Sequence, residues 1–110
     1  MQNLFTTEIS ILEIYFGLFS NKYLQKNVKL LHKRQDQIIG ILSHFIVLQF
    51  DRKAALKTAQ ITGKLSLESQ RIDFRDGMIA GTGLSNGILK IITQNVNHFD
   101  RIEKIEVISY

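Results

Sequence analysis

The sequence predicts an α/β fold with a mostly parallel sheet, on two observations. First, short apolar runs alternate with longer amphipathic segments along the whole chain. Second, residues 88–92 form a nearly continuous apolar run that ends at Thr93, which is typical of a strand buried on both faces of a parallel sheet. We therefore expect strands and helices to alternate around one sheet whose strands run mostly in the same direction.

The segment before this strand has the signals of a complete helix. Asp73 can cap its first turn, because a carboxylate there accepts hydrogen bonds from unpaired backbone amides. Asp76 follows three residues later, where an acidic side chain also interacts favourably with the helix dipole. Gly87 lies where a left-handed residue commonly ends a helix. Because ligands of open α/β sheets bind beyond the carboxyl ends of the strands, we expect Asp76 and residues 93–95 to face one cleft.

The chain begins with a predicted strand over residues 3–7 and a helix that runs through residue 18. Ser10 and Glu13 have the spacing of a capping box that would open this helix. On spacing alone, Glu13 is a capping residue. The core-facing side of the helix would carry Ile11, Leu12, Tyr15 and Phe19.

A long helix over residues 22–43 is predicted next, with Asn21 as its N-cap and Gly40 as its weakest position. Its apolar face would consist of Leu24, Val28, Leu31, Ile38 and Leu42. Four lysines follow the spacing i, i+4, i+7 and i+11 along the opposite side: Lys22, Lys26, Lys29 and Lys33. Such a stripe can bind a phosphate backbone, although it is more often simply a solvated face.

The remaining elements continue the alternation. Residues 45–48 form a buried strand, and Asp51 caps an amphipathic helix that ends near residue 65. The inward positions of that helix are Ala55, Leu56, Ala59 and Thr62. Residues 100–104 then turn the chain into a closing strand over residues 105–110.

Composition bounds the class of protein. A chain of 110 residues is enough for one small domain with a single core. It contains no cysteine, so disulfides and thiolate metal sites are excluded. The formal net charge of +4 favours a polyanionic partner. We find neither a signal peptide nor an apolar run long enough to cross a bilayer, and we expect a cytoplasmic protein without a membrane partner.

An ordered set of residues in the second half of the chain resembles PIN-domain nucleases, in particular the toxin ribonucleases of VapBC toxin–antitoxin systems. The set is Ile72, Asp76, Ile79, Ala80, Thr82, Leu84, Gly87, Ile91, Thr93, Asn95 and Phe99. Ser10, Glu13 and Gly17 are similar to the segment that carries the second acidic ligand of the family. The resemblance implies a single three-layer α/β/α domain over residues 1–110.

The resemblance also implies an endoribonuclease that uses Mg²⁺ or Mn²⁺. Glu13 and Asp76 are implied as metal ligands, direct or through water, and as catalytic residues together with Asn95. Such cations prefer oxygen ligands, and a bound ion can lower the pKa of a water and stabilise charge on a phosphate. Thr93 would orient the groups around Asn95. Asp73 is either a plain helix cap or an outer-shell acid.

Other residue patterns carry weaker signals. His32, His44 and His98 share no metal-ligand spacing, but His98 lies beside the predicted site and could contact a substrate phosphate. The glycines between residues 77 and 87 do not form a dinucleotide-binding loop, because Asn86 stands at the third required glycine. We interpret them as small residues that let the helix pack closely against the sheet.

Two features depart from the family pattern. Asn95 stands at the fourth acidic position, where an amide can ligate through its oxygen but adds no charge. The first strand of the family, which is central in the sheet and carries the first acidic ligand, has no counterpart in this chain. We therefore expect an N-terminally truncated domain. A misassigned start, a decayed gene and a fold that closes without this strand all account for it.

The sequence thus supports two functions of different classes. The first is a Mg²⁺-dependent endoribonuclease of the VapC toxin type, whose activity the absent ligand puts in question. The second is a non-catalytic protein of the same fold that binds an antitoxin or another partner. The resemblance implies RNA as the substrate, a VapB-type antitoxin as a partner, and a homodimer.

Overall fold

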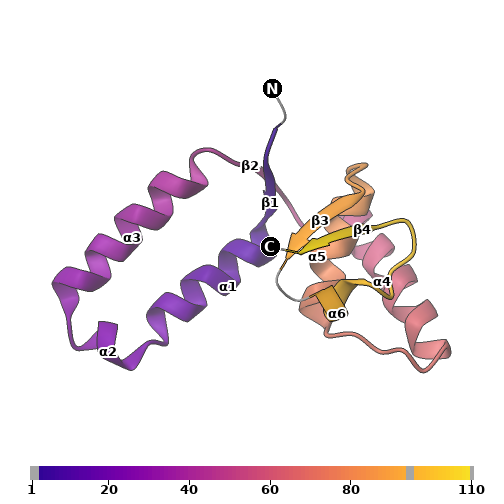
Figure 1. Cartoon of the computed structure of the whole chain (residues 1–110), viewed down its shortest axis with the longest axis horizontal. Helices are drawn as coiled ribbons and strands as arrows, with labels where there is room; N and C mark the ends of the chain where they lie inside the picture. Colours follow the sequence, from indigo (N-terminus) through magenta and orange to yellow (C-terminus); the bar gives the residue numbers. More distant parts are fainter. Residues whose placement is uncertain (1–2, 94–95, 110) are drawn as a thin grey trace. The chain divides into compact units, whose positions relative to one another are not determined.

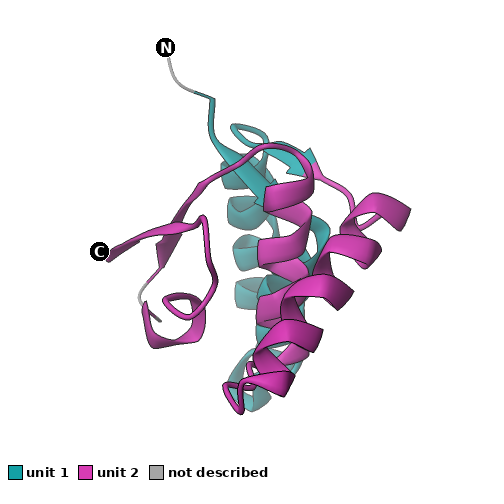
Figure 2. Cartoon of the chain, turned by 90° about the vertical axis from the view of Figure 1, so that its right-hand side faces the viewer, with its two compact units in different colours: residues 1–47 teal, residues 48–110 magenta. Residues whose placement is uncertain are grey.

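The computed structural model describes residues 3–93 and 96–109 and divides the chain into two compact units, residues 1–47 and residues 48–110 (Figure 2). Helices and strands alternate along both units (Figure 1), which confirms the α/β class. None of the described helices is long and apolar enough to cross a membrane. A single domain over residues 1–110 stays a prediction, and each unit is described by itself.

The first unit consists of a short strand pair and two long helices joined by a short one. Its elements, in chain order, are β1 (Phe5–Thr7), α1 (Glu8–Phe19), α2 (Lys22–Gln25), α3 (Val28–Leu42) and β2 (Ile46–Leu48). The strands β1 and β2 pair with each other, and beside them the Ile46 amide donates to the Leu4 carbonyl at 2.8 Å. From this pair, α1 leads away to α2 and α3 leads back (Figure 1).

Helix α1 begins before the predicted capping box, so the expected cap at Ser10 is wrong. Thr7 is the N-cap, with extended backbone angles (φ −117°, ψ 157°). Its hydroxyl accepts the Ser10 amide at 3.0 Å and donates to the Ser10 hydroxyl at 3.1 Å. The orphan amides of the first turn are thus satisfied one turn earlier than expected. Glu13 therefore lies in the middle of α1, where it has no capping role.

The predicted helix over residues 22–43 is two helices, α2 and α3. The chain leaves helical geometry at Asn27 (φ −129°, ψ 79°), whose side-chain oxygen accepts the Leu30 amide at 3.4 Å. An asparagine that binds a backbone amide in this way competes with a continuous helix, so the break lies here. Gly40, the expected point of weakness, lies inside α3. Asn21 caps α2 as predicted.

This break changes the interpretation of the lysine stripe. Lys22 lies in α2 and Lys26 is the C-cap of that helix, so only Lys29 and Lys33 share one face of α3. All four residues are exposed. A single row along one helix is therefore wrong, while contact of these lysines with RNA stays a prediction.

The second unit carries most of the predicted site. Its elements are α4 (Arg52–Leu67), α5 (Phe74–Ser85), β3 (Lys90–Thr93), α6 (Val96–Phe99) and β4 (Glu106–Ser109). Helix α4 begins as predicted, because the Asp51 side chain accepts the Ala54 amide at 2.9 Å. The helix ends two residues later than expected.

Helices α4 and α5 pack closely through small residues. A Cβ at Gly81 would lie 2.8 Å from the backbone nitrogen of Thr58 and 2.9 Å from its Cα, so only glycine allows this approach. The Thr58 hydroxyl donates to the Ala54 carbonyl at 2.7 Å and also lies 3.4 Å from the Gly77 carbonyl. Gly77 and Gly81 therefore serve close packing, as predicted, but they pack against helix α4 rather than a sheet.

The buried face of α4 differs from the predicted one. The buried residues are Ala54, Thr58 and Leu65. Three of the four residues expected to face inward are exposed: Ala55, Leu56 and Ala59. The contact with the α5 glycines selects the orientation of α4, and this contact requires small side chains at the crossing point rather than the largest apolar ones.

Helix α5 ends in the motif predicted at Gly87. Its φ of 75° is in the left-handed region that favours glycine. The Gly87 amide donates to the Leu84 carbonyl at 3.0 Å and the Ile88 amide to the Gly83 carbonyl at 2.9 Å. This pair of hydrogen bonds is a Schellman motif, and it turns the chain toward β3.

Strands β3 and β4 pair in parallel, with Lys90 opposite Glu106 and Thr93 opposite Ser109. This confirms the predicted strand direction. Burial on both faces is wrong for β3, and the expected buried strand at residues 45–48 is wrong for β2. Each strand lies in a two-stranded sheet and carries exposed apolar residues such as Ile92 and Ile46. The inner face of β3 and β4 packs on the core of the unit, which consists of Leu65, Ala80, Phe99 and Ile102.

We expect Gly81→Ala to lower the free energy of unfolding by about 1–3 kcal/mol, because a methyl group there overpacks the contact with Thr58. Gly63→Ala is the matched control. A Cβ at Gly63, inside α4, meets nothing within 4 Å, so this change should raise the free energy of unfolding by about 0.5–1 kcal/mol. Urea denaturation followed by circular dichroism measures both. Equal stabilities would contradict the close approach of the two helices.

Candidate acidic site at the start of helix α5

Asp73 fixes the first turn of α5. It has an extended backbone (φ −61°, ψ 139°), and its side chain accepts the Arg75 amide at 2.8 Å. The Arg75 side chain also lies 3.3 Å from the same carboxylate oxygen. These hydrogen bonds from Arg75 lower the pKa of Asp73 below its ordinary value. The predicted N-cap is thereby confirmed, and Asp73 stays ionised at neutral pH.

Asp76 lies one turn further on, at the third residue of the helix, and its side chain is only 16% exposed. Burial is the main cause that raises the pKa of Asp76 above its ordinary value, and the charge of Asp73 adds to it. His98 acts in the opposite direction, since its Nδ1 lies 2.9 Å from Asp76 Oδ2. The result is a partly desolvated carboxylate held by one specific partner, which is common at functional sites.

His98 reaches Asp76 from helix α6. That helix follows β3 after two residues, and its last residue, Phe99, is buried in the core of the unit. The buried Phe99 ring lies 6.5 Å from the His98 ring, centroid to centroid. The core therefore positions α6, and α6 in turn places the imidazole on Asp76.

The end of β3 comes close to the site through this connection. Thr93 is the last residue of β3 and is half-buried. Asn95, predicted as a catalytic residue, lies outside the described residues, as does Gln94. Because His98 follows them by only a few residues and contacts Asp76, the chain returns to the start of α5 soon after β3. This is consistent with the expected position of the site at the carboxyl end of the strand.

Glu13 belongs to the first unit. It is half-buried on α1, and its Oε1 is buried without a hydrogen-bond partner among the described residues. A buried carboxylate oxygen is costly unless something pairs with it. An oxygen of this kind is suited to a cation. Its pairing with Asp76 around one ion stays a prediction.

The candidate ligands are carboxylate oxygens, which are the type of donor that a hard divalent cation prefers. Within the described part of each unit, no three His, Asp or Glu side chains lie close enough together to hold a metal ion. The Glu13 oxygen, which has no hydrogen-bond partner in the described part of the chain, is the observation that favours such an ion. His98, which the sequence places beside the site, pairs with Asp76.

The contact between His98 and Asp76 is not evident from the sequence. The sequence places His98 near the site and suggests a phosphate contact for it, which stays a prediction. The two residues are 22 positions apart, and no periodicity connects them. The available signal was indirect: Phe99 is a large apolar residue in a polar loop, and its burial fixes the position of the histidine before it.

The chain belongs to the PIN-domain family, because residues 1–105 match the model of the PIN domain. Within this family its similarity is to VapC-type proteins. It is 28% identical over 101 residues to the tRNA(fMet)-specific endonuclease VapC of Salmonella typhimurium, a match that covers 92% of this chain and 70% of the relative. It is 24% identical over 96 residues to the ribonuclease VapC2 of Haemophilus influenzae, covering 87% and 67% of the two chains.

Solved structures show the same fold. FitAcB from Neisseria gonorrhoeae matches with a TM-score of 0.80 at 25% identity, covering 96% of this chain and 74% of that chain. VapBC2 from Rickettsia felis, bound to a promoter DNA fragment, matches with a TM-score of 0.80 at 18% identity, covering 98% and 75%. These matches confirm the PIN-like α/β fold that the sequence predicted.

We expect Asp76→Asn to raise the free energy of unfolding at neutral pH. The pKa of Asp76 in the folded chain is above 3.8, so the folded state binds this proton more tightly than the unfolded state, and the ionised carboxylate costs stability above that pKa. The advantage of the variant should shrink as pH falls toward 3.8. Thermal unfolding between pH 3 and pH 7 measures it.

Asp73→Asn is the companion variant with the opposite sign. The pKa of Asp73 is lowered in the folded chain, so its carboxylate contributes stability above the unfolded pKa, and this is lost as pH falls through the folded one. The variant should therefore be less stable than the parent at neutral pH and equal to it in strong acid. A loss of stability at neutral pH in Asp76→Asn would contradict the assigned environment of Asp76.

Proposed function

We propose that this chain is an endoribonuclease of the VapC type, which cleaves RNA phosphodiester bonds with Mg²⁺ or Mn²⁺. The observation that carries the proposal is the environment of Asp76. A carboxylate that is only 16% exposed, has a raised pKa and is fixed by His98 at the start of α5 is typical of functional sites. The VapC names of the relatives give the reaction class, since they are an endonuclease and a ribonuclease.

Glu13 and Asp76 would hold the metal ion, and Asn95 would add a neutral amide oxygen. The buried Oε1 of Glu13, which meets no hydrogen-bond partner among residues 3–93 and 96–109, supports its assignment. When bound, the ion supplies a Lewis acid that lowers the pKa of a water and stabilises negative charge on the phosphate. Thr93, at the end of β3, would orient the groups around Asn95.

The chain's own residues prepare the site in two ways. Asp73 caps α5 and so sets the position of the turn that carries Asp76. His98 fixes one oxygen of Asp76, which restricts the rotation of the carboxylate. The N-terminal end of α5 also carries a partial positive charge that favours a phosphate group nearby. Outside this site, the exposed lysines Lys22, Lys26, Lys29 and Lys33 would contact the RNA backbone.

We expect Asp76→Asn and Glu13→Gln each to slow metal-dependent RNA cleavage by at least about 100-fold, because each removes charge that stabilises the reacting phosphate through the ion. The assay mixes the whole chain with tRNA in MgCl₂ or MnCl₂, with EDTA as the metal-free reference. Asp36→Asn is the matched control, since Asp36 is an exposed acid on α3. Equal cleavage by the parent and both site variants would refute the site.

A second candidate function is binding of a partner without catalysis. Three large apolar side chains recur at i, i+4 and i+7 on α1, and all are exposed: Leu12 (62%), Phe16 (66%) and Phe19 (47%). The expectation that Leu12 and Phe19 face the core is therefore wrong. A contiguous exposed apolar face is typical of an interaction surface. An antitoxin of the VapB type or a second copy of the chain would cover it, as the VapBC complexes among the structural neighbours suggest by analogy.

Measuring RNA cleavage and antitoxin binding by the same chain distinguishes the nuclease from the non-catalytic binding protein. If the parent cleaves no RNA with either ion but binds a VapB-type antitoxin, we expect Phe16→Asp to abolish that binding. Leu67→Asp is the control, because Leu67 is 90% exposed and lies at the end of α4, outside the α1 face. Size-exclusion chromatography with light scattering measures the complex. Equal binding by both variants would exclude the α1 face as the partner surface.

A further inference from the structure

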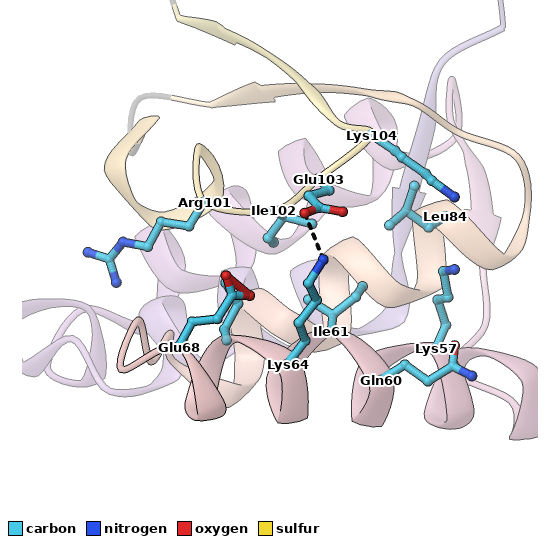
Figure 3. Close-up of a pocket in the computed structure, with 11 residues that line it drawn as sticks. Lys57, Gln60, Ile61, Lys64, Glu68, Leu84, Arg101, Ile102, Glu103 and Lys104 are labelled. Carbon is cyan, nitrogen blue, oxygen red and sulfur yellow. Dashed lines mark hydrogen bonds and ion pairs between the residues drawn. The ribbon is translucent and has the colours of Figure 1, made fainter.

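The second unit contains a pocket of about 170 Å³ that does not include Asp73, Asp76 or His98. It lies between α4, the end of α5 and the segment after α6 (Figure 3). Its floor is apolar and consists of Ile61, Leu65, Leu84 and Ile102. Nothing in the proposed cleavage site uses this pocket.

The rim of the pocket carries more positive than negative charge. Four cations, Lys57, Lys64, Arg101 and Lys104, face two carboxylates, Glu68 and Glu103. Lys64 is engaged, because its Nζ lies 2.7 Å from Glu103 Oε1, and this ion pair lowers the pKa of Glu103. Arg101 is engaged as well, since it donates to the Arg71 carbonyl at 2.7 Å.

Lys57 and Lys104 are the two cations of the rim that remain for a ligand. Both lie at the Leu84 end of the pocket (Figure 3). Lys57 forms no ion pair within the described residues, and Lys104 acts on Glu103 only through its charge. The pocket is therefore asymmetric: Lys57 and Lys104 lie at one end, Glu68 lies toward the other end, and Glu103 lies between them, paired with Lys64 (Figure 3).

We propose that this pocket binds one nucleotide of an RNA strand, with the base on the apolar floor and its phosphate between Lys57 and Lys104. The proposal deepens the proposed function and rests on it for the choice of RNA. A nucleobase has a flat apolar face that can pack against the aliphatic side chains of the floor. Its N–H groups can donate hydrogen bonds to the Glu68 carboxylate. A peptide with several acidic residues would meet the carboxylates of Glu68 and Glu103, so it fits less well.

The position of the pocket suits a strand that also reaches Asp76. Leu84 lies eight residues after Asp76 on α5, which is about 12 Å along the helix axis. A stacked strand advances about 3.4 Å per nucleotide, so roughly three or four nucleotides would join the two sites. The pocket would then add affinity for a strand without taking part in cleavage.

The test measures binding of the whole chain to a fluorescein-labelled single-stranded RNA of ten nucleotides. Binding is followed by fluorescence anisotropy in EDTA, over a range of salt concentrations. We expect Lys57→Gln and Lys104→Gln each to weaken binding about fivefold and to reduce the slope of log affinity against log salt by about 0.7. Glu103→Gln should strengthen binding, because it removes a negative charge. Lys53→Gln, on the same helix outside the pocket, is the control.

Adenosine monophosphate and inorganic phosphate separate the contributions of base and phosphate. We expect the nucleotide, but not phosphate alone at the same concentration, to shift the methyl resonances of Ile61, Leu84 and Ile102. RNA affinity that falls equally in Lys53→Gln and the pocket variants would overturn the proposal, as would competition by an acidic peptide without any by the nucleotide. Because binding is measured without metal, failure of cleavage alone would refute only the proposed function.

Discussion

The approach of α4 to α5 is the contact on which the rest of the second unit depends. Gly81 brings the backbone of α5 against Thr58, closer than any side chain at position 81 would allow. This contact fixes α5, and α5 carries Asp73 and Asp76 at its start and the Schellman turn toward β3 at its end. The candidate site is thus held by a helix pair rather than by the sheet that the sequence suggested.

The site contains one carboxylate that stabilises the fold, Asp73, and one whose charge destabilises it, Asp76. Asp73 is stabilised by the amide it caps, whereas Asp76 is partly buried near Asp73 and has a raised pKa. Opposite shifts of two neighbouring acids are a common arrangement where carboxylates have different roles. A chain that keeps a buried, destabilising carboxylate at this position, fixed by a histidine, retains a feature that packing alone does not require.

Helix ends with a single strong local signal agree with the sequence. The caps at Asp51 and Asp73 and the glycine stop at Gly87 follow from hydrogen bonds within a few residues, so the sequence alone indicates them. The predictions were wrong where two nearby residues could both form a cap or a helix break, and where contacts between distant residues determine the structure. Thr7 and Ser10 could both cap α1, and Asn27 could either break a helix or continue it. The orientation of α4 and the contact of His98 with Asp76 depend on residues far apart in the chain.

We propose that Glu13 and Asp76 hold one divalent cation, and a Mn²⁺ titration tests this. Substoichiometric Mn²⁺ broadens the NMR signals of nuclei near its binding site, so a titration of the isotope-labelled chain locates the ion without any assay of cleavage. We expect signals around both Glu13 and Asp76 to broaden first, and Asp76→Asn to weaken both effects. Broadening confined to exposed acids such as Asp36 and Glu68, with Glu13 and Asp76 unaffected, would contradict it.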